Sequence, residues 1–382
     1  MTHDPSKPLT ILQLNSARLY VGEAAHTLNL TEALRGAGHQ VLLGLRQGYT
    51  TFDAAERRGL QPHGFAMQHR WWFTHDLPDL RKLEGLVREH GVQVIHAHRG
   101  KDHWLSALAV QLKRLRVPVI RTRHVVTPLR SHMANRWLAR HTPRLIVVSR
   151  AVEREVLESG VYRTTQVARI PGGIELQRYK AQGRREELRL RMGLRSNAPV
   201  AVCVARFAAV KAHRVLLQAW QHVWARRTEA VLLLVGGGAL QGEAEAYARE
   251  LNIEAGVRFL GHLEPERVAE TLEVADVGTL ASVGSEGFSR AVLEYMALGL
   301  PVAATNVGAI PDLVENGING RLVPPHDPGA LATAVLEVLD LTPQQRAAWG
   351  LAGRRRAEEC HGYATWVKAH EELYRGVLAR RD

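Results

Sequence analysis

The chain has 382 residues, which is too long for one ordinary core and suits two α/β domains. Its hydrophobic fraction of 46% is that of a globular protein, and no segment reaches the roughly 18 apolar residues needed to span a bilayer. The first residues lack a signal-peptide pattern, and the two cysteines, Cys203 and Cys360, have no metal-type or redox spacing, so we expect a cytoplasmic protein.

Positive charge is concentrated in the first half of the chain. The formal net charge is +12, and residues 1–180 carry 27 Lys and Arg against 14 Asp and Glu, whereas residues 181–382 carry 23 against 24. This asymmetry predicts an anionic partner for the first half: a phospholipid surface, a phosphorylated acceptor or nucleic acid. A solvated basic face is the alternative that composition leaves open.

Apolar runs alternate with amphipathic segments through the first half. Residues 9–15 predict a buried strand, residues 24–38 a helix and residues 38–45 a second strand, and the pattern continues with further apolar runs at 92–98, 118–124 and 144–149. Such an alternation is typical of a parallel, doubly wound sheet. We expect this N-terminal domain to cover residues 1–178.

A second alternating set begins after Tyr179. It predicts strands over 200–207, 230–238, 257–263, 277–281, 301–306 and 320–325. We therefore expect a second domain over 179–360 and a final helix over 363–378. The predicted fold class is α/β, with two Rossmann-like parallel-sheet domains facing a central cleft.

Ligands of open parallel sheets gather beyond the carboxyl ends of the strands, so the loops after strands are the candidate sites. Gly22 lies in the first such loop, where it could let the backbone approach a ligand. Arg206 and Lys211 follow the first strand of the second domain and could converge on a diphosphate. Their alternatives are an ordinary turn glycine and two solvated cations.

The most informative segment is 282–301, SVGSEGFSRAVLEYMALGLP. Its apolar spacing predicts a short helix that starts near Phe288 and ends by Gly299, which makes Glu286 a loop residue and Glu294 a helix residue. Free N–H groups at such a helix start, together with a carboxylate, suit a sugar and a phosphate. The glycines of 235–242 have G-x-G-x-x-x-G spacing, which indicates a tight turn rather than a dinucleotide site.

Histidines lie at strand ends in the first half. His96, His98 and His124 have no accompanying HExxH-type pattern, so hydrogen bonding is a better expectation than metal ligation. The chain also lacks an Asp-x-Asp motif. We therefore expect no cofactor and no metal, with charge on a leaving group met by cations and helix ends.

Taken together, these segments resemble glycosyltransferase family 4, whose members have the GT-B fold. The most specific match is SEGFSRAVLEYMALGLPVAATNVGAIPDLVENGINGRLVPPHD (285–327), and further collinear matches are VARFAAVKAHRVLLQAW, LLLVGGG, VRFLGHL and IPGGIELQRY. The resemblance covers almost the whole chain. It implies that residues 1–178 bind the acceptor, that residues 179–360 bind the nucleotide sugar, and that the C-terminal segment 361–382 crosses back to the first domain. It implies a retaining, metal-independent transferase that takes a sugar from a UDP-, GDP- or ADP-sugar.

The resemblance also implies roles for individual residues. Arg206 and Lys211 would hold the donor diphosphate, Glu286 would bind hydroxyls of the transferred sugar, and His124 would approach the reacting centre. The remaining donor-binding positions would be Gly22 at the phosphates, Leu263 by the base, Gly287, Phe288 and Ser289 at sugar or phosphate, and Glu294 at the ribose.

The sequence departs from the family pattern at several loop positions. Small residues replace customary glycines at Val21, Ala205, Ala212, Ala309 and Ser289. Because each replacement is small, we expect the phosphate-binding backbone to persist, although the donor or the rate could differ.

The acceptor is predicted only as a class, a hydroxyl of a cell-envelope glycan, lipopolysaccharide or lipid-linked molecule. Aromatic and basic residues mix in 70–83 and in 128–144, which suggests peripheral attachment to the inner face of the plasma membrane; a core aromatic cluster with a charged outer face is the alternative. Nucleic acid is not the expected partner. The competing functions are a nucleotide-sugar epimerase or NAD enzyme and a non-catalytic nucleic-acid or anion-binding protein.

Overall fold

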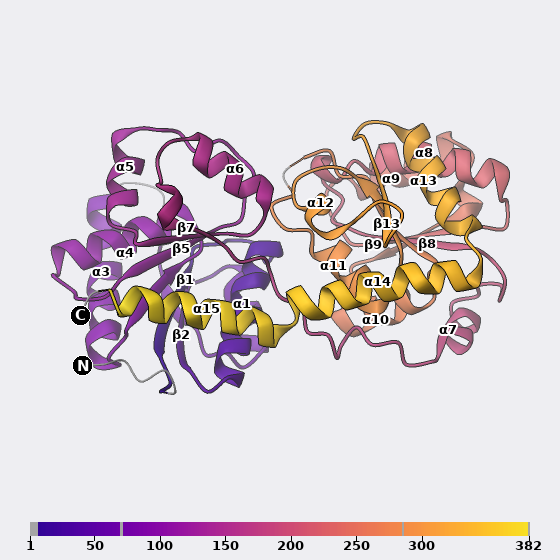
Figure 1. Ribbon diagram of the computed structural model, residues 1–382. Helices are drawn as coiled ribbons and strands as arrows, with labels where there is room; N and C mark the ends of the chain where they lie inside the picture. Colours follow the sequence, from indigo (N-terminus) through magenta and orange to yellow (C-terminus); the bar gives the residue numbers. More distant parts are fainter. Residues whose placement is uncertain (1–6, 69–71, 285, 381–382) are drawn as a thin grey trace. The chain divides into compact units, whose positions relative to one another are not determined.

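The computed structural model describes residues 7–68, 72–284 and 286–380. The chain divides into two compact units, one formed by Met1–Gly173 with Tyr363–Asp382 and the other by Ile174–Gly362. Each unit has its own parallel sheet (Figure 1). Of the aromatic stretch at 70–83, residues 70 and 71 lie outside the described part of the chain.

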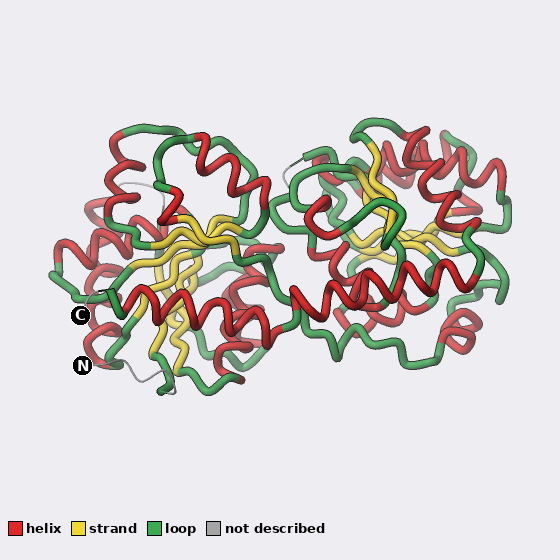
Figure 2. The backbone as a smooth tube through the Cα atoms, viewed as in Figure 1, coloured by secondary structure: helices red, strands yellow, loops and turns green. Residues whose placement is uncertain are grey.

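Unit 1 contains a seven-stranded sheet in the order β3-β2-β1-β4-β5-β6-β7. Its pairs are parallel, so that Ile11 lies between Val41 and Val94. The strands read as nearly continuous apolar runs because helices cover both faces of the sheet (Figure 2). The strands are β1 (Thr10–Asn15), β2 (Gln40–Arg46), β3 (His63–Phe65), β4 (Val94–Ala97), β5 (Val119–Arg123), β6 (Arg144–Val147) and β7 (Val167–Arg169).

The helices of unit 1 include the last helix of the chain. Trp366, Val367 and Tyr374 of that helix pack with Leu9 and Ile11 of the first strand region in one buried cluster, so the C-terminal segment is part of this core. The helices are α1 (Gly22–Gly36), α2 (Thr50–Arg57), α3 (Trp72–Glu89), α4 (Gly100–Leu112), α5 (Met133–Arg140), α6 (Arg150–Glu158), η1 (Thr164–Gln166) and α15 (Tyr363–Leu378).

Unit 2 contains a six-stranded parallel sheet in the order β10-β9-β8-β11-β12-β13. Its strands are β8 (Val200–Val204), β9 (Val231–Val235), β10 (Val257–Gly261), β11 (Val277–Leu280), β12 (Val302–Thr305) and β13 (Gly320–Val323). Both units therefore show the parallel sheets that the sequence predicts, and the predicted α/β class with two parallel-sheet domains is confirmed.

The helices of unit 2 surround one large apolar core. Trp220 is its largest fully buried side chain. The helices are α7 (Arg185–Arg191), η2 (Ala209–Lys211), α8 (His213–Arg226), α9 (Gln241–Glu250), η3 (Glu254–Gly256), α10 (Pro265–Glu273), α11 (Arg290–Leu298), α12 (Ile310–Leu313), α13 (Pro328–Asp340) and α14 (Pro343–His361).

The central predicted helix is α11, and it begins two residues later than expected from Phe288. Ser289 is its N-cap, and Gly299 ends it with a φ of 82°, a left-handed conformation that glycine adopts at little cost. Gly299 also approaches Gly350 of α14 so closely that a Cβ on Gly350 would lie 2.0 Å from the Gly299 carbonyl oxygen. The chain thus turns sharply from α11 into β12.

Ala212 joins η2 to α8 in a left-handed conformation, with φ 46° and ψ 49°. A Cβ in this region costs roughly 1–2 kcal/mol, which explains why glycine would suit the position. We expect Ala212→Gly to raise the free energy of unfolding by up to about 1 kcal/mol, since added freedom in the unfolded chain offsets part of the relief. Urea denaturation checks this, and a loss of stability would contradict it.

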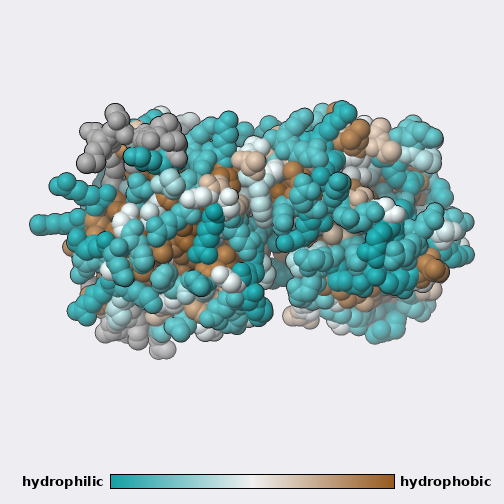
Figure 3. All heavy atoms as spheres, turned by 90° about the horizontal axis from the view of Figure 1, so that it is seen from below, coloured by the Kyte–Doolittle hydropathy of each residue, from teal (hydrophilic) through white to brown (hydrophobic). Residues whose placement is uncertain are grey.

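The surface is mostly hydrophilic on the face seen in Figure 3, where hydrophobic side chains form only small separate areas. Among the described residues, every helix is too short or too polar to cross a membrane.

Candidate functional site

Glu286 is the centre of the candidate site in unit 2. Its side chain is only 5% exposed, and Oε1 accepts a hydrogen bond from Ser282 Oγ at 2.6 Å. The same oxygen forms an ion pair with Lys211 Nζ. A buried carboxylate requires such partners, and Lys211 therefore fixes the position of Glu286 before any ligand arrives.

Lys211 reaches Glu286 because two loops pair along their backbones. Val283 N donates to Val210 O at 3.0 Å, which joins η2 to the loop that follows β11. The Lys211 side chain is 20% exposed, so the ammonium group contacts Glu286 and keeps access to solvent. The sequence predicted both residues as donor-site groups, and the structure brings them together.

The backbone of Glu286 is held by the loop that follows β12. Ala309 N donates to Glu286 O at 2.7 Å. Gly308 has φ +56°, and a Cβ there would lie 2.1 Å from the same oxygen, so only glycine fits. Ala309, which stands where the family commonly has glycine, thus makes the backbone hydrogen bond to Glu286 with its own amide.

Arg206 is an exposed residue of the loop after β8, and its guanidinium has no ion-pair partner among the described carboxylates. A glycine loop packs directly against this segment: a Cβ on Gly236 would lie 2.1 Å from Ala205 O, and one on Gly238 would lie 2.5 Å from Phe207 O. Phe207 N donates to Gly237 O at 3.0 Å. These glycines serve close backbone packing, which confirms the interpretation of 235–242 as a tight turn.

The N-terminus of α11 lies next to Glu286 in the chain. Gly287 and Ser289 are buried and Phe288 is half-buried, with its ring 6.4 Å from that of His361. The helix has no side-chain cap, and the buried Ser289 hydroxyl has no hydrogen-bond partner in the described chain. Unsatisfied donors at a helix start form a ready site for an anion.

Glu294 lies on α11, and its carboxylate already has two partners. Oε1 accepts hydrogen bonds from Tyr179 Oη and from Arg290 Nε, each at 2.8 Å. Burial and the adjacent Glu294 charge raise the pKa of Tyr179, so the phenol stays protonated and donates. Ribose binding by Glu294 stays a prediction.

Apolar and neutral groups surround Lys211. His213 stacks on Phe207 at 4.0 Å, and burial, with the charge of Lys211, lowers the pKa of His213 to about 4. Burial raises the pKa of Cys203 to about 12. Leu263 follows β10 and packs half-buried against the core. Lys211 and Glu286 thus form a charged pair beside the neutral side chains of His213 and Cys203, and the predicted place of Leu263 by the base stays a prediction.

Gly22 is the first residue of α1 in unit 1. It is exposed, its φ lies outside the left-handed region, and a Cβ built on it meets no atom within 4 Å. Neither conformation nor packing requires glycine here. If Gly22 is needed at all, it is needed for the close approach of a ligand phosphate, as predicted.

We therefore expect Gly22→Ala to leave stability unchanged or raise it by about 0.5–1 kcal/mol and to weaken nucleotide-sugar binding about tenfold. Gly36→Ala is a matched control, because Gly36 ends the same helix with equally open space around it. Thermal denaturation and calorimetric titration measure the two effects. Equal donor affinities for both variants would remove Gly22 from the site.

Histidines cluster at the carboxyl edge of the unit 1 sheet. His96 bonds Tyr374 Oη and Thr122 Oγ1, each at 2.7 Å, and His98 bonds Gln13 Oε1 at 2.9 Å, which confirms that they are hydrogen-bonded. His124 lies 3.2 Å from His98, measured Nε2 to Nδ1. Burial, with the charges of Arg121 and Arg99, lowers the pKa of His124 to about 3.

The predicted basic amphipathic segment at 128–144 contains α5. Trp137 stacks on Trp104 with ring centres 5.4 Å apart, so its ring is committed to packing within the unit. Arg136, Arg140 and Met133 are exposed, Met133 by 88%. Membrane attachment stays a prediction, and it rests on these side chains rather than on the tryptophan.

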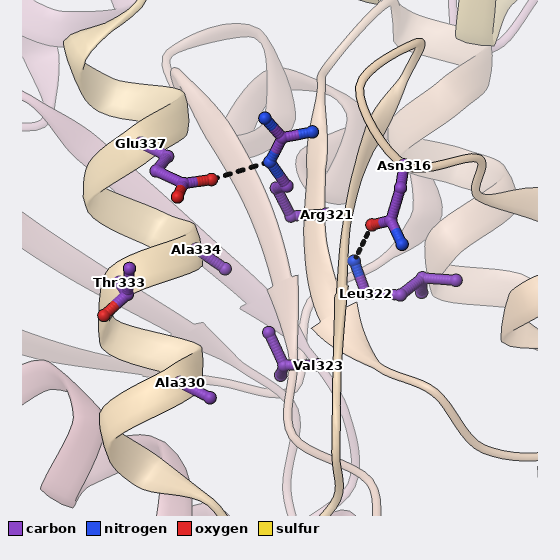
Figure 4. A pocket seen from close by; sticks show the side chains of 8 residues that line it. All are labelled: Asn316, Arg321, Leu322, Val323, Ala330, Thr333, Ala334 and Glu337. Carbon is purple, nitrogen blue, oxygen red and sulfur yellow. Dashed lines mark hydrogen bonds and ion pairs between the residues drawn. The ribbon is translucent and has the colours of Figure 1, made fainter.

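A cavity of about 540 Å³ lies elsewhere in unit 2, between α13 and β13 (Figure 4). Arg321 and Glu337 form an ion pair at its wall, with Nε and Oε2 2.6 Å apart, and Asn316 Oδ1 accepts from Leu322 N. None of the predicted donor-binding residues lines this cavity, so it is separate from the site around Glu286.

Comparison with known proteins assigns the family. Residues 21–178 match the family described as Glycosyltransferase Family 4, and residues 198–341 match Glycosyl transferases group 1. The chain is 31% identical over 310 residues to D-inositol 3-phosphate glycosyltransferase 2 of Catenulispora acidiphila, covering 74% of this chain and 70% of the relative. The chain belongs to glycosyltransferase family 4.

Two further proteins are similar to this glycosyltransferase. A GDP-mannose-dependent monoacylated alpha-(1-6)-phosphatidylinositol monomannoside mannosyltransferase of Corynebacterium glutamicum is 30% identical over 197 residues, 50% of this chain and 51% of the relative. The structure of Anabaena Alr3699/HepE in complex with UDP superposes with a TM-score of 0.83 at 21% identity, covering 96% of this chain and 99% of that one. The chain is thus a glycosyltransferase with the GT-B fold, and the epimerase and nucleic-acid-binding alternatives are set aside.

Sequence reasoning missed several residues that shape the site. Ser282 and Gly308 bond or pack on Glu286, yet neither stands out as a chemical motif. His26 joins the histidine cluster from α1, with its ring centre 4.6 Å from that of His124. Because α1 starts at the carboxyl edge of the sheet, the position of His26 near the start of this helix is a sequence signal that could have found it.

Proposed function

We propose that this glycosyltransferase transfers a sugar from a nucleotide diphosphate sugar to an acceptor hydroxyl, with retention of anomeric configuration and without a metal at the diphosphate. The observation that carries the proposal is the Lys211–Glu286 ion pair beside the uncapped start of α11. It offers a cation and helix N–H groups for the leaving phosphate and a carboxylate for the sugar hydroxyls.

The geometry also bears on the stereochemistry. As the sugar–phosphate bond breaks, negative charge grows on the phosphate and positive charge on the ring, and Lys211, Arg206 and the α11 start would stabilise the phosphate. Glu286 is tied to Lys211 and Ser282, an arrangement that suits orientation of the donor more than nucleophilic attack. We therefore assign Glu286 to sugar binding, with the acceptor attacking from the side of the leaving group.

The test is a panel of UDP-, GDP- and ADP-sugars, screened by calorimetry and by slow donor hydrolysis. One donor class should bind, and Arg206→Ala should weaken it at least tenfold. Arg214→Ala is the matched control, because Arg214 is an exposed arginine of α8 that stacks on Tyr247 instead.

Transfer should persist in EDTA and give a product of unchanged anomeric configuration by NMR. Absence of donor binding, or an inverted product, would overturn the proposal.

For the acceptor we propose an anionic molecule, such as a phosphorylated polyol or a lipid-linked, lipopolysaccharide or other cell-envelope glycan. Support comes from Arg46 at the end of β2, which is 5% exposed and whose Nε and Nη1 have no hydrogen-bond partner in the described chain. Arg46 and the exposed Arg18 both lie over the Tyr49 ring, 4.7 Å and 5.8 Å from its centre. The phosphorylated acceptor in the name of the Catenulispora relative fits such a pair.

We expect Arg46→Met to raise the KM for a phosphorylated acceptor about tenfold or more, with little effect on the KM of its unphosphorylated counterpart. The free energy of unfolding should stay equal or rise, because the buried guanidinium that is removed forms no hydrogen bond to a carboxylate. Arg35→Met, on the neighbouring helix, is the control for loss of an arginine. If Arg46→Met instead lowers the free energy of unfolding and leaves both KM values unchanged, Arg46 is structural.

A further inference from the structure

Three histidines of unit 1 present imidazole nitrogens to one point. His26 lies on α1, His98 follows β4 and His124 follows β5, and one ring nitrogen of each lies within 4.8 Å of the other two. Three imidazoles with an open fourth position are a common ligand set for zinc. We propose that His26, His98 and His124 bind a divalent transition-metal cation of the Zn²⁺ class.

The separation of the ring nitrogens fits this coordination. His98 Nδ1 and His124 Nε2 are 3.2 Å apart, and two nitrogens at 2.0–2.1 Å from a tetrahedral metal would lie roughly 3.3 Å apart. His26 is 8% exposed, and its Nε2 has no hydrogen-bond partner in the described chain. A buried nitrogen without a partner is costly, and a bound cation would satisfy it.

The hydrogen bond to Gln13 selects the required form of His98. Gln13 Oε1 accepts from His98 Nε2 at 2.9 Å, so the proton sits on Nε2 and the lone pair of Nδ1 points into the cluster. Without a cation, His124 Nε2 donates to that lone pair. Binding then needs only that the His124 proton move from Nε2 to Nδ1, so no net proton is released.

The surrounding charges permit a cation. Arg99 and Arg121 oppose a cation, but Arg99 is paired with Glu23. Asp102 is fully buried and accepts bonds from His98 N at 2.6 Å and Ser16 Oγ at 2.7 Å, which places a negative charge directly behind His98.

The site has a consequence that rests on the proposed function. His124 is the partly exposed member of the cluster, whereas His26 and His98 are buried. His124 is also the residue we expect to approach the donor sugar. A cation bound to its imidazole would withdraw His124 from that role, and we infer that Zn²⁺ inhibits sugar transfer.

The experiment uses the full, tag-free chain with Cys360→Ser, which removes an exposed thiol that could bind soft metals. Co²⁺ is the probe, read by the visible absorption of the tetrahedral ion and displaced by Zn²⁺. One equivalent should bind. His26→Asn should raise the Kd by about 100-fold or more, and Gln13→Leu by about tenfold as a ligand-orienting residue. His222→Asn, an exposed histidine of α8, should have no effect.

Folding is checked by thermal denaturation, and His124→Asn, at a partly exposed position, provides a second ligand variant. Equal Co²⁺ affinity in the parent protein, His26→Asn and His124→Asn would overturn the metal site. If Zn²⁺ inhibits the parent and His26→Asn equally, the inferred link between this metal site and sugar transfer is overturned. If the parent protein turns over none of the nucleotide sugars, the proposed function fails, but the metal site is still tested, because Co²⁺ binding is measured without a substrate.

Discussion

Lys211→Met should lower kcat by about 10²–10³-fold, the cost of removing one preorganised group that stabilises charge in the transition state. The same change leaves Glu286 buried without its cation. Breaking a buried pair from one side costs about 3–5 kcal/mol, and we expect the lower end because Lys211 is 20% exposed. Steady-state kinetics and urea denaturation measure the two losses separately.

The double variant Lys211→Met with Glu286→Gln separates catalysis from folding. It removes both charges together, so most of the stability should return, whereas kcat should stay low because the cation and the sugar-binding carboxylate are both missing. Lys180→Met, at an exposed lysine of the same unit, is the control and should behave like the parent. A kcat for Lys211→Met within threefold of the parent would exclude the proposed role in leaving-group stabilisation.

Much of this fold is readable from the sequence because both sheets are parallel and buried. Strands covered on both faces read as continuous apolar runs, so residues 200–207 and 230–238 stand out, and their cores are β8 and β9. The short β3 and the polar helix α14 lack that signal. α14 carries a mixture of arginine and small residues, and its packing against α11 through Gly350 is a tertiary feature.

The site is less readable because its contacts join distant loops. Lys211 and Glu286 are 75 residues apart in the chain, and the sequence predicts each as a ligand group but not their ion pair. Glu294 is predicted on α11, yet its bond to Tyr179 spans 115 residues. The same limit applies to His26, whose ring meets His124 only because α1 begins at the strand edge. The sequence shows the type of each residue, whereas the contacts between distant residues depend on how the sheet brings their loops together.

The stability of unit 2 depends on another cluster of distant residues, centred on Asp276. This carboxylate, 9% exposed, accepts from Arg185 Nη2 at 2.7 Å and Arg189 Nη2 at 2.9 Å, and from Arg346 Nη1 at 2.8 Å and Val200 N at 2.9 Å. It therefore joins α7, α14 and β8 to the start of β11. Three guanidinium groups share one negative charge.

Asp276→Asn should lower the stability of unit 2 by about 3–5 kcal/mol, because Arg189, with a side chain only 4% exposed, would keep a buried charge without a carboxylate. Hydrogen exchange against urea, read on peptides of each unit, should show earlier opening in unit 2 and an unchanged unit 1. The kcat of folded protein should persist, since Asp276 precedes β11 whereas Glu286 follows it. Asp340→Asn is the control: Asp340 is a 55% exposed partner of Arg227, and its loss should cost less than about 1 kcal/mol. Similar losses in the two variants would show that the arginines around Asp276 are satisfied by their backbone carbonyls alone.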